Sequence, residues 1–230
     1  MKINLSKFKG KTIAIDGPAG SGKSTTARLL AARLGYRFLD TGAMYRALTL
    51  FALRYDIAPS DGGKLKVLAE KLPIEFKTQE DFNRVLINGE DVTDPIRSPE
   101  VNLHVSEVSA HLGVRQAMVA KQKELGKNGS IVAEGRDTTS VVFPDADLKV
   151  YLDASVEERA QRRLLDLARL GVSTNLEEQK ADIERRDKFD SSREHSPLTR
   201  TRGVIVVDTT NMTIEGQIDH IIALFREVVK

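Results

Sequence analysis

Residues 17–24, which read GPAGSGKS, are the part of this chain whose residue types and spacing most directly indicate chemistry. They fit the pattern G-x-x-x-x-G-K-[ST], in which a glycine-rich backbone points its N–H groups at the phosphates of a nucleotide. Lys23 is expected to reach the β- and γ-phosphates, and Ser24 to offer its hydroxyl to Mg²⁺. The predicted triphosphate site comprises Gly17, Pro18, Ala19, Gly20, Ser21, Gly22, Lys23, Ser24 and Thr25.

Arginines near the ends of the expected elements indicate what receives the phosphoryl group. Phosphoryl transfer needs positioning and charge cancellation, and an acceptor that is itself a phosphate adds repulsion between two polyanions. Guanidinium groups that approach from several elements can relieve that repulsion because they fork onto phosphate oxygens. The candidates are Arg46, Arg115, Arg136, Arg159, Arg162, Arg163, Arg186 and Arg193. This pattern favours a kinase that transfers a phosphoryl group from one nucleotide to another.

A second acidic residue is expected near Mg²⁺, at the end of a core strand that faces the glycine-rich loop. Asp40, Glu134 and Asp153 each follow an apolar run. A helix cap or a solvated strand end is the alternative interpretation for each of them. We favour Glu134, acting directly or through water, because Arg136 and Asp137 would place an arginine and a second carboxylate at the same edge.

The elements that must hold these side chains follow from hydrophobic periodicity. A β-branched strand at 12–15 precedes the loop, and apolar residues at helical spacing follow it. Further short apolar runs lie at 36–39, 131–133, 148–152 and 204–207. Five such runs alternating with helices predict an α/β fold, with a five-stranded parallel sheet flanked by helices. Thr41 is a candidate N-cap for a helix over 43–54, and a helical stretch from 101 to 125 has a possible break at Gly113.

The segment after Pro59 changes character. Asn88-Gly89 between apolar residues predicts a hairpin, so residues 60–105 are expected to form a small β-containing insertion. Residues 155–196 combine two helical stretches with many arginines. Helical pairs such as Glu158 with Arg162 are also compatible with a merely solvated face.

Composition excludes several classes of protein. The 230 residues include 35 basic and 33 acidic ones, so the net charge of +2 gives no general reason to expect nucleic acid or a membrane as partner. The chain has no cysteine, which excludes disulfides and thiolate chemistry. The lysines near the start interrupt any signal-like apolar run, so a cytoplasmic protein is expected. The four histidines show no metal-ligand spacing.

Six blocks, taken together, resemble the bacterial cytidylate kinases, which are P-loop nucleoside monophosphate kinases. They are GPAGSGKS at 17–24, LDTGAMYR at 39–46, EGRD at 134–137, VVFPDA at 141–146, YLDA at 151–154 and RRD at 185–187. The similarity spans essentially the whole chain. It implies transfer of the γ-phosphoryl group of ATP to CMP or dCMP by a monomeric enzyme that uses Mg²⁺. It also implies that 60–105 is a monophosphate-binding subdomain and 155–196 an arginine-rich lid, within one kinase domain over 1–230.

The resemblance also assigns roles to single residues. Lys23, Arg136 and Arg186 would act in catalysis. The CMP-binding residues would be Thr41, Gly42, Arg46, Ser106, Arg115, Arg136, Asp137, Arg186, Asp190 and Arg193. Arg46 and Arg136 would clamp the acceptor phosphate. Asp137 facing cytosine N4 and Arg115 facing N3 and O2 fit the donor and acceptor pattern of that base.

One block departs from the family pattern. After Gly135-Arg136-Asp137 the family usually has an apolar residue and then Gly-Thr, whereas this chain has Thr138, Thr139 and Ser140. A positive φ at Thr139 would carry a steric cost and would displace Asp137. Two alternatives stay open: another small P-loop kinase with a different acceptor, and, remotely, a GTP-dependent switch, for which the chain lacks an N-K-x-D motif.

Overall fold

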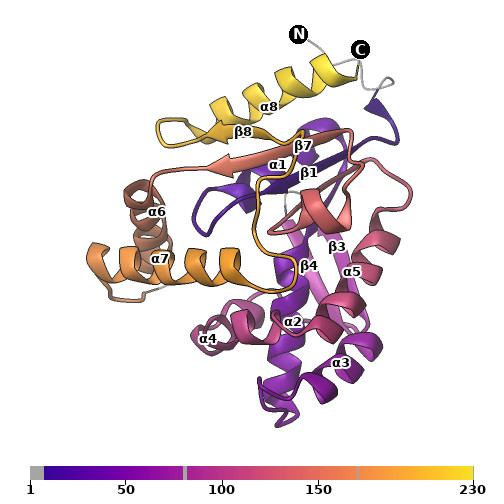
Figure 1. The fold of residues 1–230 in the computed structure, drawn as a ribbon, viewed down its shortest axis with the longest axis vertical. Coiled ribbons are helices and arrows are strands. Elements are labelled where there is room, and N and C mark those ends of the chain that lie inside the picture. The colour runs from indigo at the N-terminus through magenta and orange to yellow at the C-terminus, as the bar shows by residue number, and fades with distance from the viewer. Residues whose placement is uncertain (1–7, 80–81, 170, 230) are drawn as a thin grey trace.

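The computed structural model describes residues 8–79, 82–169 and 171–229, and its centre is a sheet of five parallel strands (Figure 1). The strand order is β2-β6-β1-β7-β8, and every neighbouring pair is parallel. The bounds are β1 (Thr12–Asp16), β2 (Arg37–Asp40), β6 (Ile131–Gly135), β7 (Leu148–Asp153) and β8 (Ile205–Asp208). The predicted α/β class and strand number are confirmed. Because all strands run the same way, their carboxyl ends meet at one edge.

Helices cover both faces of this sheet, as expected for parallel strands that are apolar on both sides. On one face, α1 (Lys23–Leu34) and α8 (Ile214–Val228) pack with buried Ile13 and Ile15 of β1. On the other face, α2 (Thr41–Arg54) and α5 (Leu112–Gly126) enclose a second core with Leu39 and Ala133. Alternate residues of the strands therefore belong to different cores.

The segment after α2 contains the second, smaller sheet. Its order is β3-β4-β5, with α3 before it and α4 after it. The bounds are α3 (Gly62–Lys71), β3 (Ile74–Gln79), β4 (Phe82–Ile87), β5 (Glu90–Asp91) and α4 (Pro99–Val108). The hairpin predicted at Asn88-Gly89 is confirmed: both residues have positive φ, 51° and 83°, as a tight β4–β5 turn requires.

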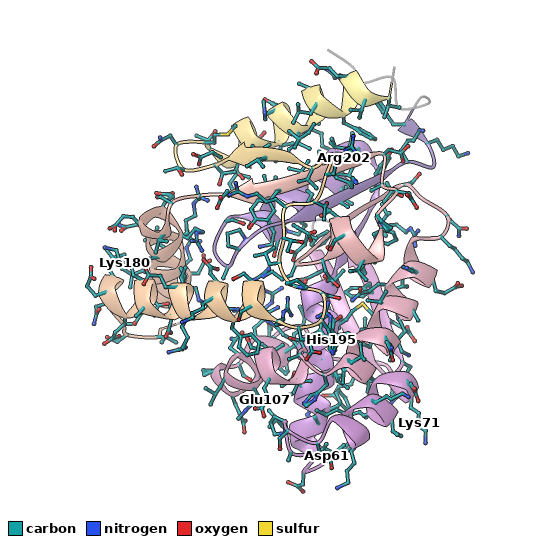
Figure 2. The ribbon with its side chains drawn as sticks, in the orientation of Figure 1. Asp61, Lys71, Glu107, Lys180, His195 and Arg202 are labelled. Atoms are coloured by element: carbon teal, nitrogen blue, oxygen red, sulfur yellow. The ribbon has the colours of Figure 1, made fainter. Side chains whose placement is uncertain are left out.

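Two helices that pack together, α6 (Val156–Arg169) and α7 (Leu176–Ser192), stand out from the main body beside the carboxyl edge of the sheet (Figure 1). Lys180 of α7 pairs with Glu157 of α6, and Figure 2 shows this lysine at the helical hairpin. The chain then crosses the front of the molecule past His195 to reach β8. No helix within the described ranges combines the length and apolar character that spanning a bilayer requires.

Two local predictions are corrected. The N-cap of α2 is Asp40, whose Oδ1 accepts from Ala43 N at 2.8 Å, and Thr41 is the first helical residue. The interruption between α4 and α5 falls before Gly113, which lies inside the first turn of α5. A charged carboxylate caps better than the neighbouring threonine here because it also faces the positive end of the helix.

Candidate active site

The glycine-rich loop joins β1 to α1, as its flanking residues predicted. Gly17 has φ 153°, and a Cβ there would lie 2.1 Å from the backbone oxygen of Leu152. A Cβ on Gly20, at φ 77°, would lie 2.9 Å from the backbone oxygen of Arg159. Helix α1 has no side-chain cap and no acidic residue in its first turn. Its free N–H groups therefore suit an anion.

Lys23 folds back over this loop. Its Nζ donates to the backbone oxygen of Pro18 at 2.7 Å, and its side chain is buried. Burial, followed by repulsion from Arg136, lowers the pKa of Lys23 to about 7. Negative charge at Glu134 and Asp16 opposes that shift. A triphosphate would add the anionic partner that this cation lacks.

Glu134 is the last residue but one of β6 and lies beside the loop. The hydroxyl of Ser24 donates to Glu134 Oε1 at 2.7 Å, so the two residues predicted to hold Mg²⁺ are brought together. Burial, with added repulsion from Asp40, raises the pKa of Glu134 to about 7, while Lys23 and Ser24 act in the opposite direction. Asp153, the third candidate acid, instead pairs with Arg200.

The raised pKa of Glu134 predicts a pH-dependent stability. The folded protein holds a proton that the unfolded chain releases near pH 4.5, so this contribution is present below pH 4.5 and is lost as pH rises towards 7. The unfolding midpoint of the wild type minus that of Glu134→Gln should fall by about 5 °C between pH 5 and 7.5 without nucleotide. Thermal unfolding across this range checks it, and a difference that grows with pH would contradict it.

Three arginines predicted to hold phosphate come close enough to repel one another. Burial, with added repulsion from Arg136 and Arg46, lowers the pKa of Arg186 to about 9. Burial likewise lowers the pKa of Arg46. Within the described part of the chain, Arg186 Nε is buried without a hydrogen-bond partner, and Arg46 Nε reaches only Asn102 Oδ1, at 3.4 Å. This excess of positive charge is typical of an anion site.

Gly42 leaves room for one of these arginines. A Cβ at Gly42 would lie 3.0 Å from Arg46 Nη1 and 3.2 Å from Asp40 Oδ1. Gly42 is helical, so Gly42→Ala should keep or raise the unfolding temperature. Because the new methyl group displaces the guanidinium of Arg46, the KM for the phosphate acceptor should rise about tenfold. Steady-state kinetics with thermal unfolding checks this; an unchanged KM would remove Arg46 from the acceptor site.

Asp137 and Arg115 form a buried ion pair. Arg115 Nη2 donates to Asp137 Oδ2, and each residue is 3% exposed. Arg115 also donates to the backbone oxygen of Ser109 at 3.1 Å, and its guanidinium lies 5.3 Å from the ring centroid of Tyr45. Burial disfavours the charge, but Tyr45 and Asp137 raise the pKa of Arg115 overall. Ser106 lies one helical turn before Ser109 on α4, half-buried.

Residues predicted to bind substrate from the second arginine-rich helix, α7, contact the main body of the protein. Arg136 Nε donates to Asp190 Oδ2 at 2.7 Å, which ties α7 to the end of β6. Attraction to Arg136 and Arg193 outweighs burial and lowers the pKa of Asp190. Arg193 Nε reaches the backbone oxygen of Asp190 at 3.4 Å. Thr41, another predicted CMP-binding residue, lies on α2 and donates its hydroxyl to the backbone oxygen of Glu134 at 2.7 Å.

Two arginines of α6 are engaged with protein groups. Arg159 donates to the backbone oxygens of Ala154 at 2.9 Å and Ala19 at 3.1 Å, and to Asp187 Oδ2 at 2.5 Å. Arg162 donates to Glu158 Oε1 at 2.9 Å and to the backbone oxygen of Thr209 at 2.7 Å. Arg159 thereby links the phosphate loop to α7.

Three residues at this edge were not predicted from the sequence. Asp16, fully buried at the end of β1, accepts hydrogen bonds from Thr138 and Thr139. Arg97 lies 3.9 Å from Asp40, and Asn102 accepts from Arg46. Glu134 was predicted because it is an acidic residue at the end of a core strand. Asp16 likewise lies at the end of a core strand, β1, so it could have been predicted in the same way. Arg97 and Asn102 lie in the insertion, where hydrophobic periodicity did not indicate any site residue.

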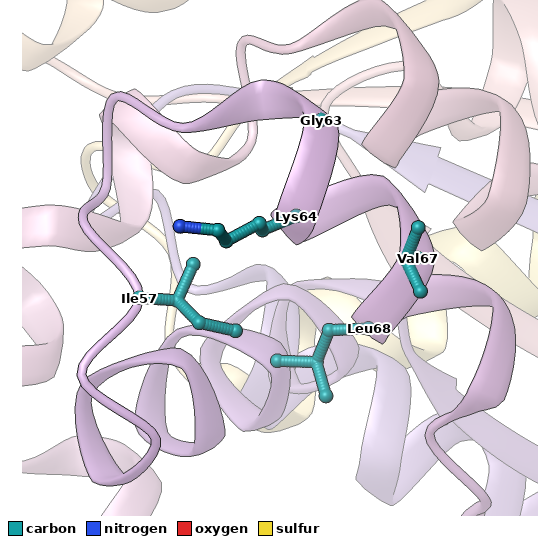
Figure 3. A pocket seen from close by; sticks show the side chains of 5 residues that line it. All are labelled: Ile57, Gly63, Lys64, Val67 and Leu68. Carbon is teal, nitrogen blue, oxygen red and sulfur yellow. The ribbon is translucent and has the colours of Figure 1, made fainter.

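Two cavities lie elsewhere. One, of about 340 Å³, is lined by Ile57, Gly63, Lys64, Val67 and Leu68 beside α3 (Figure 3). The other, of about 440 Å³, is lined by Lys66, Glu70, Gly113, Gln116, Ala117, Ala120 and Lys121, between α3 and α5. Neither contains a residue of the predicted site. The site is recognised by its charge arrangement at the carboxyl edge of the sheet.

Comparisons with known proteins identify the family. The family model described as cytidylate kinase matches residues 13–227. A cytidylate kinase of Geobacillus sp. (strain WCH70) is 48% identical over 215 residues, which cover 94% of this chain and 96% of that protein. A cytidylate kinase of Geobacter sulfurreducens is 45% identical over 219 residues, covering 95% and 94%.

A solved structure of an uncharacterized protein from Eubacterium ventriosum is similar in fold alone, with a TM-score of 0.53 and 11% identity over 94% of this chain and 98% of that one. The family assignment comes from sequence: the family model covers most of the chain, and close relatives match it almost from end to end. This chain therefore belongs to the cytidylate kinase family.

Proposed function

We propose that the protein transfers the γ-phosphoryl group of ATP to CMP or dCMP, forming ADP and CDP or dCDP. Family membership supports this activity. The observation that carries it within the structure is the pairing of two sites at one sheet edge: an anion-binding loop with Lys23, and a cluster of poorly compensated arginines beside the Arg115–Asp137 pair. The first suits a triphosphate donor, and the second an acceptor with a phosphate and a polar base.

Mg²⁺ is the cofactor we propose. Ser24 and Glu134 offer two oxygens in contact, and Mg²⁺ is commonly held by one or two protein oxygens with substrate phosphates and water completing its shell. Within the described residues, no three acidic or histidine side chains form a cluster that could hold a metal by themselves. This donor set fits an ion that arrives with the nucleotide. When bound, it would neutralise charge on the phosphates.

In the proposed mechanism the protein positions the two substrates and neutralises the negative charge of their phosphates. Lys23 leaves the Pro18 oxygen and binds the transferred group, and Arg186 and Arg136 add positive charge beside it. The acceptor oxygen belongs to a phosphate, which is already anionic near neutral pH, so no general base is required. Exclusion of water by the two arginine-rich helices would limit hydrolysis of ATP.

The acceptor is held at both ends. Arg46 and Arg136 bind its phosphate, and Arg186, Asp190 and Arg193 reach its sugar and phosphate. At the base, Asp137 accepts from N4 of cytosine, while Arg115 and Ser106 face N3 and O2. Uracil would set O4 against the Asp137 carboxylate, which costs ~1–3 kcal/mol for each unpaired group.

We assign residues 60–105 as the monophosphate-binding subdomain and 155–196 as the lid of a single kinase domain. The near balance of 35 basic and 33 acidic residues gives no general reason to expect nucleic acid or a membrane as partner, and we propose free nucleotides as the ligands. We propose a monomer that acts in the cytoplasm. Light scattering of the purified protein would test the monomer.

A coupled ADP-release assay with ATP and Mg²⁺ tests the activity. The acceptor panel is CMP, dCMP, UMP, AMP, shikimate and gluconate, each over a range of concentrations. We expect kcat/KM to be greatest for CMP or dCMP and about tenfold or more lower for UMP. Preference for AMP or for a polyol would identify another small P-loop kinase. Hydrolysis without any acceptor, with a preference for GTP, would identify a switch.

A further inference from the structure

The departure from the family pattern at Thr139 has a structural counterpart. Asp16 ends β1 and is 0% exposed. Its Oδ1 accepts from Thr138 N at 2.8 Å, and its Oδ2 accepts from Thr139 N at 2.7 Å and from Thr139 Oγ1 at 2.6 Å. Thr139 is not among the described residues with positive φ, so the anticipated strain is absent. The threonine instead contributes a hydroxyl donor that a glycine could not supply.

This contact joins the two halves of the site. Gly17, the first residue of the phosphate loop, follows Asp16 directly, and Asp137 directly precedes Thr138. The strands that carry them, β1 and β6, are neighbours whose register places Asp16 beside Gly135. A displacement of the turn relative to β1 would therefore change the distance between the ATP loop and the residues that face the acceptor.

We propose that Asp16 and Thr139 form a positioning pair that sets the donor loop against the acceptor residues Arg136 and Asp137. The inference rests on the proposed phosphotransfer between nucleotides. Three donors on one carboxylate form short, charge-assisted hydrogen bonds in a buried position. The hydroxyl of Thr139 adds a second hydrogen bond to Asp16 Oδ2, beside the one from its backbone N–H. Asp16 also acts on Lys23, because its negative charge favours the protonated amine.

Both residues are buried, so an effect on folding must be separated from an effect on positioning. A displacement of about 1 Å between reacting groups costs roughly 100-fold in rate, whereas each binding site considered alone is unchanged. Positioning therefore predicts a loss in kcat with nearly constant KM for each substrate. A purely structural role predicts a lower unfolding temperature and normal kcat per folded molecule.

The test compares Thr139→Val, which is nearly isosteric and lacks the hydroxyl, with Thr139→Ser, which restores it. We expect kcat to fall about tenfold in Thr139→Val, with KM for ATP and for CMP each within about twofold of wild type. Thr139→Ser should recover most of the loss. Normal kcat in folded Thr139→Val, no recovery in Thr139→Ser, or a loss confined to KM for CMP would each overturn the pair.

A binding measurement separates this inference from the proposed function. Calorimetry with a non-hydrolysable ATP analogue, with and without CMP, should show that CMP and the analogue affect each other's affinity in wild type. We expect that coupling to fall at least fivefold in Thr139→Val and in Asp16→Asn, whose amide cannot accept from all three donors. Unchanged coupling would refute the pair. If wild type neither binds nor phosphorylates CMP, the proposed function fails; the pair is then tested with the acceptor that the wild type does use, and unchanged coupling between that acceptor and the analogue in Thr139→Val would refute it.

Discussion

Replacing Lys23 by methionine is expected to reduce kcat by about 100- to 1,000-fold, with a smaller effect on the KM for the acceptor. The amine is the buried cation of the phosphate loop, and its pKa of about 7 reflects burial and the neighbouring Arg136. A bound triphosphate would hold it protonated during transfer. Its loss removes charge compensation where negative charge develops, and water cannot replace it.

The fold should survive this change. Methionine has a similar length, and removing a buried amine removes the cost of its desolvation. The unfolding midpoint without nucleotide should therefore stay within a few degrees of wild type. Lys180→Met is the matched control, because that lysine lies on α7 and pairs with Glu157 away from the phosphate loop. Steady-state ADP release checks both variants; a normal kcat for Lys23→Met would refute the mechanism.

Replacing Asp137 by alanine should lower kcat/KM for CMP by about 100-fold or more while KM for ATP stays within about twofold. The carboxylate is the proposed acceptor for cytosine N4, and it is also the partner of Arg115. The substitution leaves a buried guanidinium with only the Ser109 oxygen and the Tyr45 ring. Breaking a buried pair in this way costs ~3–5 kcal/mol, so the unfolding temperature should also fall.

The Asp137→Asn variant separates base recognition from stability. An amide keeps the volume and can still accept from Arg115, but its NH₂ group then faces the base. It would oppose the cytosine amino group and would suit O4 of uracil. The ratio of kcat/KM for CMP over UMP should therefore fall by about tenfold or more. Competition kinetics with both nucleotides measures it. An equal loss for CMP and ATP in both variants would mark Asp137 as structural.

The parts of the site that local chemistry specifies could be predicted from the sequence. The glycine-rich loop, the β1 strand before it and the α1 helix after it are fixed by residues close together in the chain, and the structure has them there. The Ser24–Glu134 contact was also anticipated, because parallel strands bring their carboxyl ends together. Single-residue roles in substrate binding stay predictions.

Contacts for which two neighbouring residues compete were harder to predict from the sequence. Asp40 takes the cap of α2 from Thr41, whose hydroxyl is used instead by the Glu134 backbone oxygen. The family comparison suggested strain at Thr139, whereas a buried carboxylate 123 residues away explains the threonine. Such pairings depend on which strands become neighbours, and the strand order β2-β6-β1-β7-β8 does not follow the order of the chain.

The repulsion among Arg46, Arg136 and Arg186 has a consequence for the lifetime of the protein. Free energy stored in facing cations lowers the stability of the empty enzyme, and a bound phosphate compound returns it. Sub-global opening then becomes more frequent when nucleotides are scarce, and opened chains are what proteases cleave. Resistance of this enzyme to proteolysis is therefore expected to rise with nucleotide concentration.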